Sequence, residues 1–269
     1  MFACADPSVA VDLAQWAEQL GLDSLWVGEH VVLPDPQRPP SPMAPTDPCL
    51  DPIVTLALFA GVTSRIGLGT GVIVLPQRNP VVLAKQLASL DVACAGRLIV
   101  GIGAGYLEAE MTAVGVPMSR RGQRTDEYLR AMRSLWFDDH PRFEGDFVSF
   151  ADVDAHPRPR QGPLPITVGG SSRAAHVRAV TSGDGWYGFA LDVDDTVAQL
   201  ASLRQVLSEV ERPDSLGPLE ITVTPKSALD AASIERFAEL GVDRLLPSLP
   251  RRGDAQRQRD FVEATASLQ

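Results

Sequence analysis

The stretch GLDSLWVGEH, residues 21–30, runs within ten residues from the end of a helix through a strand to a polar loop. Gly21 follows residues 6–20, in which apolar side chains recur at helical spacing after a capping aspartate. Residues 24–27, SLWV, predict a short buried strand. Gly28-Glu29-His30 then places two ionisable side chains directly at the end of that strand.

The same alternation of helix and strand recurs along the whole chain. Strands are predicted at residues 2–5, 24–27, 66–75, 97–101, 165–168, 185–188, 219–223 and 244–246, and a helix follows each of them. This order predicts a parallel sheet with right-handed crossovers. A (β/α)8 barrel typically needs about 250 residues, so the 269 residues favour one α/β domain, a (β/α)8 TIM barrel over residues 1–269. An open doubly wound sheet is the alternative.

Two segments interrupt the alternation. Residues 33–52, after the second strand, are rich in proline and have almost no periodicity, which is typical of a functional lid or a disordered insert. Residues 143–148, before the fifth strand, predict a small hairpin packed on the barrel. Between these segments, residues 122–137 predict a strongly amphipathic helix.

Composition excludes several classes of function. The formal net charge of −10 argues against nucleic-acid binding, which needs a basic face. The three cysteines, Cys4, Cys49 and Cys94, contain no CxxC pair and indicate neither a disulfide framework nor a thiolate zinc site. The longest clean apolar run, residues 53–62, is too short to span a bilayer, and the first residues lack the pattern of a signal peptide. We therefore expect a cytoplasmic protein without a membrane partner.

In a barrel, the residues that follow the strands converge on one face. Here they include Glu29-His30, 71–72, 103–106 and 169–172, and three of these four segments are rich in glycine. Glycine lets a flat ligand or a phosphate approach the backbone closely. Gly169-Gly170 directly before a helix start could bind an anion. A Gly-Gly pair in this position is, however, more often a simple turn between strand and helix.

His30 is the one histidine at a predicted strand end, so a metal site with several converging ligands is disfavoured. Two other roles remain open for His30. It could donate or accept a proton during catalysis, or it could support the long loop through a hydrogen bond. The run GIGAG at residues 101–105 lacks the GxGxxG spacing of a dinucleotide site, and no GxSxG elbow is present.

Several of these segments together resemble the luciferase-like flavin oxidoreductases. They are residues 22–30, 64–72, 78–80, 84–91, 96–106 and 168–170, in the order of that family. Residues 105–110, 115–116 and 121–122 are most similar to its branch that uses the deazaflavin coenzyme F420.

The resemblance implies a barrel that lays a deazaflavin ring over the strand ends. The cofactor-binding residues that it implies are Glu29, Gly71, Val72, Ala104, Gly105, Tyr106, Gly169, Gly170, Ser172 and Arg173. Within this set, Gly71-Val72 lies where the family often has a non-prolyl cis peptide, and residues 169–173 match its phosphate-binding stretch. The family's sugar-phosphate dehydrogenases have a glutamate directly after the glycine run, where this sequence has Tyr106, so that activity is not favoured.

The function that we expect is hydride transfer between coenzyme F420 and a small organic substrate, with His30 as the catalytic acid or base. No metal is expected, and the family resemblance implies a homodimer. The alternatives are an FMN-dependent monooxygenase of the same family and a non-catalytic member that binds the cofactor.

Overall fold

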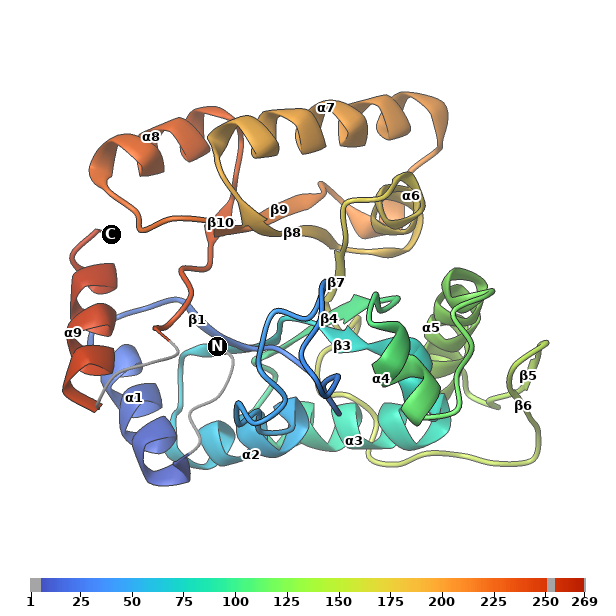
Figure 1. The fold of residues 1–269 in the computed structure, drawn as a ribbon. Coiled ribbons are helices and arrows are strands. Elements are labelled where there is room, and N and C mark those ends of the chain that lie inside the picture. The colour runs from blue at the N-terminus through green and yellow to red at the C-terminus, as the bar shows by residue number, and fades with distance from the viewer. Residues whose placement is uncertain (1–5, 251–254, 269) are drawn as a thin grey trace.

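The computed structural model describes residues 6–250 and 255–268, which form an α/β fold around one curled parallel sheet (Figure 1). Neighbouring strands follow the path β1-β2-β4-β7-β8-β9-β10, and the short β3 pairs with β4. Every pair in this sheet is parallel. The bounds are β1 Ser24–Val27, β2 Gly67–Thr70, β3 Ile73–Val74, β4 Leu98–Gly103, β7 Ile166–Gly169, β8 Gly185–Leu191, β9 Glu220–Pro225 and β10 Arg244–Leu245.

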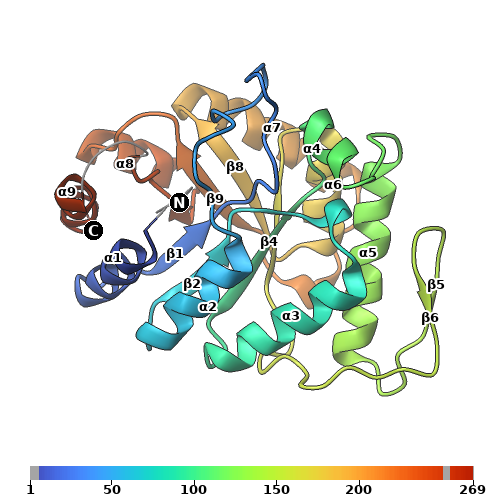
Figure 2. The same ribbon diagram turned by 60° about the horizontal axis from the view of Figure 1, so that its bottom comes forward.

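Helices surround the outside of this sheet (Figure 2). Their bounds are α1 Pro7–Gln19, α2 Pro52–Val62, α3 Pro80–Ala93, α4 Glu108–Ala113, α5 Arg121–Phe137, α6 Arg173–Ser182, α7 Val193–Glu209, α8 Ala231–Glu239 and α9 Ala255–Ala266; short 3-10 turns span Leu75–Gln77 and Asp214–Leu216. The first three helices each start with a capping side chain followed by proline, at Asp6, Asp51 and Asn79. Proline fits the first helical position because its missing N–H has no partner there anyway.

The core lies between the sheet and these helices, and β4 runs through its centre. Leu98, Val100 and Ile102 of β4 are completely buried. A strand covered on both sides has to be apolar throughout, as parallel sheets with flanking helices require. The alternation predicted from the sequence is therefore confirmed as an α/β fold with a parallel curled sheet.

Two details of the fold differ from the expectation based on the sequence, and a third expected element cannot be compared. The strand expected at 66–75 is divided into β2 and β3 by Gly71-Val72, whose peptide bond is cis as the resemblance implied. Helix α4 was not predicted. The strand expected at residues 2–5 lies outside the described residues.

The expected hairpin is present as β5 Phe143–Glu144 and β6 Ser149–Phe150. Its turn is held by the buried carboxylate of Glu127 on α5, which accepts the backbone N–H groups of Asp146, Phe147 and Val148 at 2.6–2.9 Å. Among the helices that the structure describes, none is both long and apolar enough to cross a membrane.

Candidate active site

A cavity of about 680 Å³ lies at the carboxyl ends of the strands. Its lining comes from the ends of β1, β2, β4 and β7, from β8, from the start of α5 and from the proline-rich loop at Pro42. The residues that supply its chemistry are Glu29, His30, Gly71, Val72, Gly103, Ala104, Gly105, Tyr106, Arg120, Arg121, Gly169, Gly170, Ser171, Ser172, Arg178, Tyr187 and Phe189. The strand-end segments that the sequence indicated therefore surround one common space.

The floor of this cavity is formed by close packing of Val72 against two glycines. A Cβ atom at Gly103 would lie 2.9 Å from Cγ2 of Val72, and one at Gly169 would lie 3.0 Å from Cγ1 of the same side chain. Side chains at these positions would push Val72 out of place, so glycine keeps the floor smooth. A smooth floor of backbone and one aliphatic side chain suits a flat ring system.

His30 and Glu110 form a buried pair at the wall of the cavity. Nδ1 of His30 lies 3.2 Å from Oε2 of Glu110, and the two side chains are 4% and 2% exposed. The second carboxylate oxygen, Oε1, accepts the N–H of Val31 at 2.6 Å. A carboxylate can only accept, so we assign the ring proton to Nδ1. In the neutral imidazole, Nε2 is then the nitrogen that can take a proton.

Glu29 lines the cavity but uses its carboxylate to hold the protein together. Its Oε2 accepts the N–H of Val74 at 2.6 Å, and its Oε1 pairs with the guanidinium of Arg78. Burial raises the pKa of Glu29, and the charge of Arg78 opposes that rise. Arg78 also pairs with Asp51 at 2.6 Å, where the proline-rich loop ends and α2 begins. These contacts fix the loop to the strand ends.

The opposite side of the cavity suits an anion. Ser172 caps α6 by accepting the N–H of Ala175 at 3.2 Å, which leaves the first N–H groups of the helix at the cavity edge. Arg121 adds positive charge there and is positioned by bonds to the carbonyl oxygens of Gly105 and Met118 at 3.1 and 3.0 Å. Arg178 also lines this side, but its buried guanidinium is paired with Asp126 and donates to the carbonyl of Gly122. A phosphate would find both a helix dipole and the guanidinium of Arg121.

Of the site residues suggested by the sequence, Arg173 alone does not line the cavity. Its side chain is exposed and pairs with Glu209 on α7, away from the cavity lining. Sequence reasoning assigned no role to Glu110, Arg121 or Arg178, although the first two lie in the segments 105–110 and 121–122 that resemble the F420 branch. Arg178 lies on a predicted helix, where a charged residue usually indicates a solvated face.

Tyr187 of β8 forms the inner wall. Its hydroxyl lies 2.7 Å from Oγ1 of Thr224, and burial raises the pKa of Tyr187 to about 12. The phenol therefore stays neutral under ordinary conditions. In the described part of the chain, no group of three or more His, Cys, Asp or Glu side chains is arranged to hold a metal ion.

Comparison with known proteins gives one family over nearly the whole chain. The family model of the luciferase-like monooxygenases matches residues 4–265. An uncharacterized protein of Mycobacterium tuberculosis strain H37Rv is 34% identical over 263 residues, which covers 94% of this chain and 91% of that protein. An F420-dependent glucose-6-phosphate dehydrogenase of Kineococcus radiotolerans is 34% identical and covers 83% of this chain and 65% of its own length. An FMNH(2)-dependent dimethylsulfone monooxygenase of Pseudomonas putida is 38% identical over 46% of this chain and 37% of its own length.

Solved structures have the same fold. An F420-dependent secondary alcohol dehydrogenase, in complex with an F420-acetone adduct, superposes with a TM-score of 0.78 at 20% identity, covering 98% of this chain and 95% of that one. The monooxygenase RslO1 of Streptomyces bottropensis superposes with a TM-score of 0.68 at 26% identity, covering 97% of this chain and 73% of that one. The curled sheet is thus the barrel of these proteins, and both F420 and FMN occur among the relatives.

Proposed function

The chain belongs to the luciferase-like monooxygenase family, and we propose that it is an oxidoreductase that transfers a hydride between coenzyme F420 and a small organic substrate. The observation that carries this proposal is the joint placement of a smooth glycine floor, an anion-binding edge and a buried histidine–carboxylate pair around one cavity. The F420-dependent dehydrogenase of Kineococcus, which is 34% identical, supports the choice of cofactor.

The residues present fit a flat group that carries a phosphate. The floor has no room for a Cβ atom at Gly103 or Gly169 without moving Val72. Arg121 and the start of α6 offer the charge that a phosphate needs. In this proposal Gly71, Ala104, Gly105 and Tyr106 would enclose the ring above the floor formed by Val72. Gly169, Gly170 and Ser172 together with Arg121 would hold the phosphate.

His30 handles the proton that accompanies the hydride. When bound, the deazaflavin supplies the ring carbon that accepts or returns the hydride. In the oxidative direction the substrate C–H bond breaks and its electron pair leaves with the hydrogen. The hydroxyl proton passes to Nε2 of His30, whose Nδ1–H donates to Glu110, and a carbonyl remains. Pro42, from the loop that Arg78 anchors through Asp51, lines the cavity and would help to exclude water from it.

Titration of the purified full-length apoprotein with F420, followed by fluorescence, tests the cofactor. Saturable binding is expected for the wild type. Arg121→Met should weaken F420 binding at least tenfold, because it removes a guanidinium from the anion side. Arg130→Met serves as the control, since Arg130 is an exposed arginine of the same helix. Equal F420 binding by both variants would show that Arg121 does not contribute to the cofactor site.

Turnover tests the role of His30. Reduced F420 is mixed with the enzyme and a panel of neutral ketones, enones, quinones and imines, and its oxidation is followed by absorbance. His30→Ala should bind F420 as the wild type does but lose turnover by roughly 100-fold or more, the usual contribution of a general acid. Unchanged turnover and an unchanged pH profile would disprove the acid–base role.

A flavin-dependent monooxygenase is the second candidate, because the relative from Pseudomonas putida uses FMNH(2). Both cofactors have a tricyclic ring and a phosphate, so the same floor and anion side could hold either. The titration separates the two. Tight binding of FMN without binding of F420 would replace our proposal with this one.

A further inference from the structure

The buried indole of Trp186 connects β8 to the turn that forms the anion side of the cavity. Its Nε1 donates to the carbonyl of Gly170 at 2.8 Å, and Gly170 lies between β7 and α6. The N–H of Gly170 in turn donates to the carbonyl of Tyr187 at 3.3 Å. Because β8 binds both polar groups of this glycine, the orientation of the turn is set from β8.

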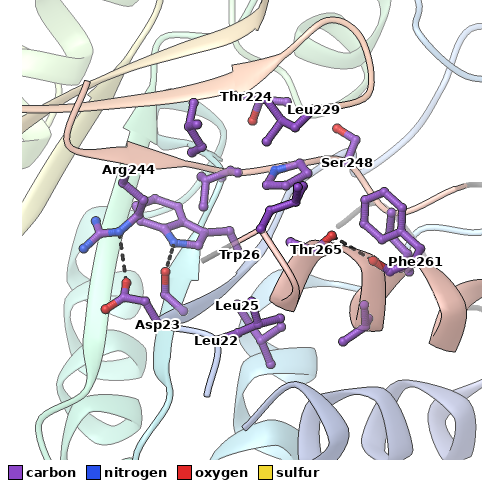
Figure 3. Close-up of a pocket in the computed structure, with 18 of the residues that line it drawn as sticks. Leu22, Asp23, Leu25, Trp26, Thr224, Leu229, Arg244, Ser248, Phe261 and Thr265 are labelled. Atoms are coloured by element: carbon purple, nitrogen blue, oxygen red, sulfur yellow. Dashed lines mark hydrogen bonds and ion pairs between the residues drawn. The ribbon is translucent and has the colours of Figure 1, made fainter. Parts of the chain in front are cut away.

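The other indole bonds that the structure describes lie away from this cavity. Nε1 of Trp26 donates to Ser24 on the same strand (Figure 3), and Nε1 of Trp136 donates to the carbonyl of Ala84 on α3, each at 3.0 Å. None of these four residues belongs to the cavity lining in the described ranges. Trp136 therefore offers a buried indole with the same type of bond, remote from the proposed cofactor, for comparison with Trp186.

The position of the Trp186 ring is fixed by its neighbours. The side chain is completely buried, and the ring of His176 on α6 meets it edge-on with the centroids 5.6 Å apart. The indole also covers Gly188, where a Cβ atom would lie 2.6 Å from Cη2 of the ring. A side chain at position 188 would displace the indole, so glycine there lets the ring keep its place and its bond to the turn.

The bond to Gly170 determines where the next N–H group points. The carbonyl of Gly170 and the N–H of Ser171 belong to one peptide unit, which is not among the cis peptide bonds of the described chain. In a planar trans peptide these two groups point in opposite directions. Since the carbonyl points to the buried indole, the N–H of Ser171 points away from it, to the exposed side of a turn that lines the cavity. Within residues 6–250 and 255–268, this N–H has no acceptor.

We propose that Trp186 is a positioning residue for the phosphate of the cofactor. By holding the carbonyl of Gly170, it directs the N–H of Ser171 at the phosphate. This inference rests on the proposed function, because the cofactor belongs to it. A hydrogen bond to a charged group is strong only when it is well aligned, so a peptide that can turn contributes less to phosphate binding. The cofactor ring, proposed to lie above Val72, makes no use of this bond.

Trp186→Phe tests the role, because it keeps an aromatic ring and removes the N–H. F420 and its phosphate-free ribityl deazaflavin core are titrated into the full-length protein and followed by fluorescence. The variant should bind the core as the wild type does. Its preference for F420 over the core should fall about tenfold, the scale of one hydrogen bond to a charged group.

Trp136→Phe is the matched control, since it removes a buried indole N–H that also donates to a backbone carbonyl. Its preference for F420 over the core should equal that of the wild type. An unchanged preference in Trp186→Phe would overturn the positioning role. An equal loss of affinity for both ligands would overturn it too, because general loosening of the fold acts on the ring and the phosphate alike.

Replacement of Trp186 alone by 3-benzothienylalanine, which has sulfur in place of the indole N–H, preserves the ring shape and repeats the test if Trp186→Phe does not fold. FMN against riboflavin, and inorganic phosphate followed by calorimetry, are measured in parallel. Binding of FMN or phosphate that weakens in the Trp186 variants, with no binding of F420 by the wild type, would contradict the proposed function and support the role of Trp186. A wild type that prefers neither phosphate-bearing cofactor to its phosphate-free form would overturn that role, whether or not the ring binds.

Discussion

At the level of single residues, Glu110 determines which nitrogen of His30 carries the proton. The carboxylate accepts from Nδ1 and, through its other oxygen, from the N–H of Val31. The sequence indicated His30 because it follows a strand end directly. Glu110 could not be identified in this way, because its partner is 80 residues away and its helix, α4, has only six residues, too few for a periodic pattern.

The substitution Glu110→Gln tests this positioning role. The amide would keep an acceptor for Val31 but present an NH2 group to Nδ1 of His30, which must then accept, so the proton moves to Nε2. Turnover should fall roughly tenfold to 100-fold, with F420 binding unchanged. Because an enzyme cannot alter the reaction equilibrium, kcat/KM should fall by the same factor in both directions. Nitrogen NMR of His30 would report the change of tautomer directly.

Glu108→Gln is the matched control, since Glu108 is an exposed glutamate on the same helix. Wild-type kcat/KM in Glu110→Gln, together with an inactive His30→Ala, would show that His30 acts without help from Glu110.

The pair of Arg78 with Glu29 makes a second residue-scale prediction. Arg78→Met leaves the buried carboxylate of Glu29 without its counter-charge, and burial already raises the pKa of this group. Breaking one side of a buried pair costs about 3 kcal/mol or more of unfolding free energy. Urea denaturation should show this loss for Arg78→Met and a partial recovery in the double variant with Glu29→Gln. Arg204→Met, at an exposed site on α7, should change little. No recovery in the double variant would mean that Arg78 stabilises chiefly through Asp51.

At the level of elements, periodicity found nearly every helix and strand but not how they are joined. Residues 66–75 are continuously compatible with a strand, and only the tertiary fit of Val72 against Gly103 and Gly169 explains the break between β2 and β3. The start of β2 has a similar long-range cause. Glu18 of α1 accepts the N–H groups of Ser64, Arg65 and Ile66 at 2.6–3.0 Å, which fixes the entry to the strand.

These three bonds make the stability of the α1–β2 contact depend on pH. Burial acts to raise the pKa of Glu18, but the backbone N–H groups of Ile66, Arg65 and Ser64 outweigh it and lower the pKa to about 2, from 4.5 for a free glutamate. A lowered pKa adds stability that is complete above about pH 4.5 and is lost as the pH falls towards 2. Urea midpoints of wild type and Glu18→Gln should therefore differ at neutral pH and converge in acid. A constant difference across this range would show that the charge of Glu18 is irrelevant.

At the level of the whole molecule, the alternation of elements was enough to predict the parallel sheet, and the strand-end segments that it indicated line one cavity. Surfaces were harder to predict. Helix α2 is apolar almost all round, with the sequence PIVTLALFAGV, yet one side of it is exposed in the single chain. A helix with no polar face is normally buried on every side. Val54 on α2 is 58% exposed and Val82 on the neighbouring α3 is 55% exposed.

We propose that this face of α2 and α3 packs against a second copy of the chain. Such a contact would bury the valines and Leu58, which is 39% exposed, and the homodimer implied by the family resemblance would follow. The double variant Val54→Glu, Leu58→Glu places two like charges on each side of the contact, where they repel and lose hydration. Light scattering after gel filtration should give twice the 28.9 kDa chain mass for the wild type and a single chain mass for the variant. Val197→Glu, at another exposed valine, on α7, should remain dimeric. A wild type that is monomeric at micromolar concentration, or a double variant that stays dimeric, would rule out this interface.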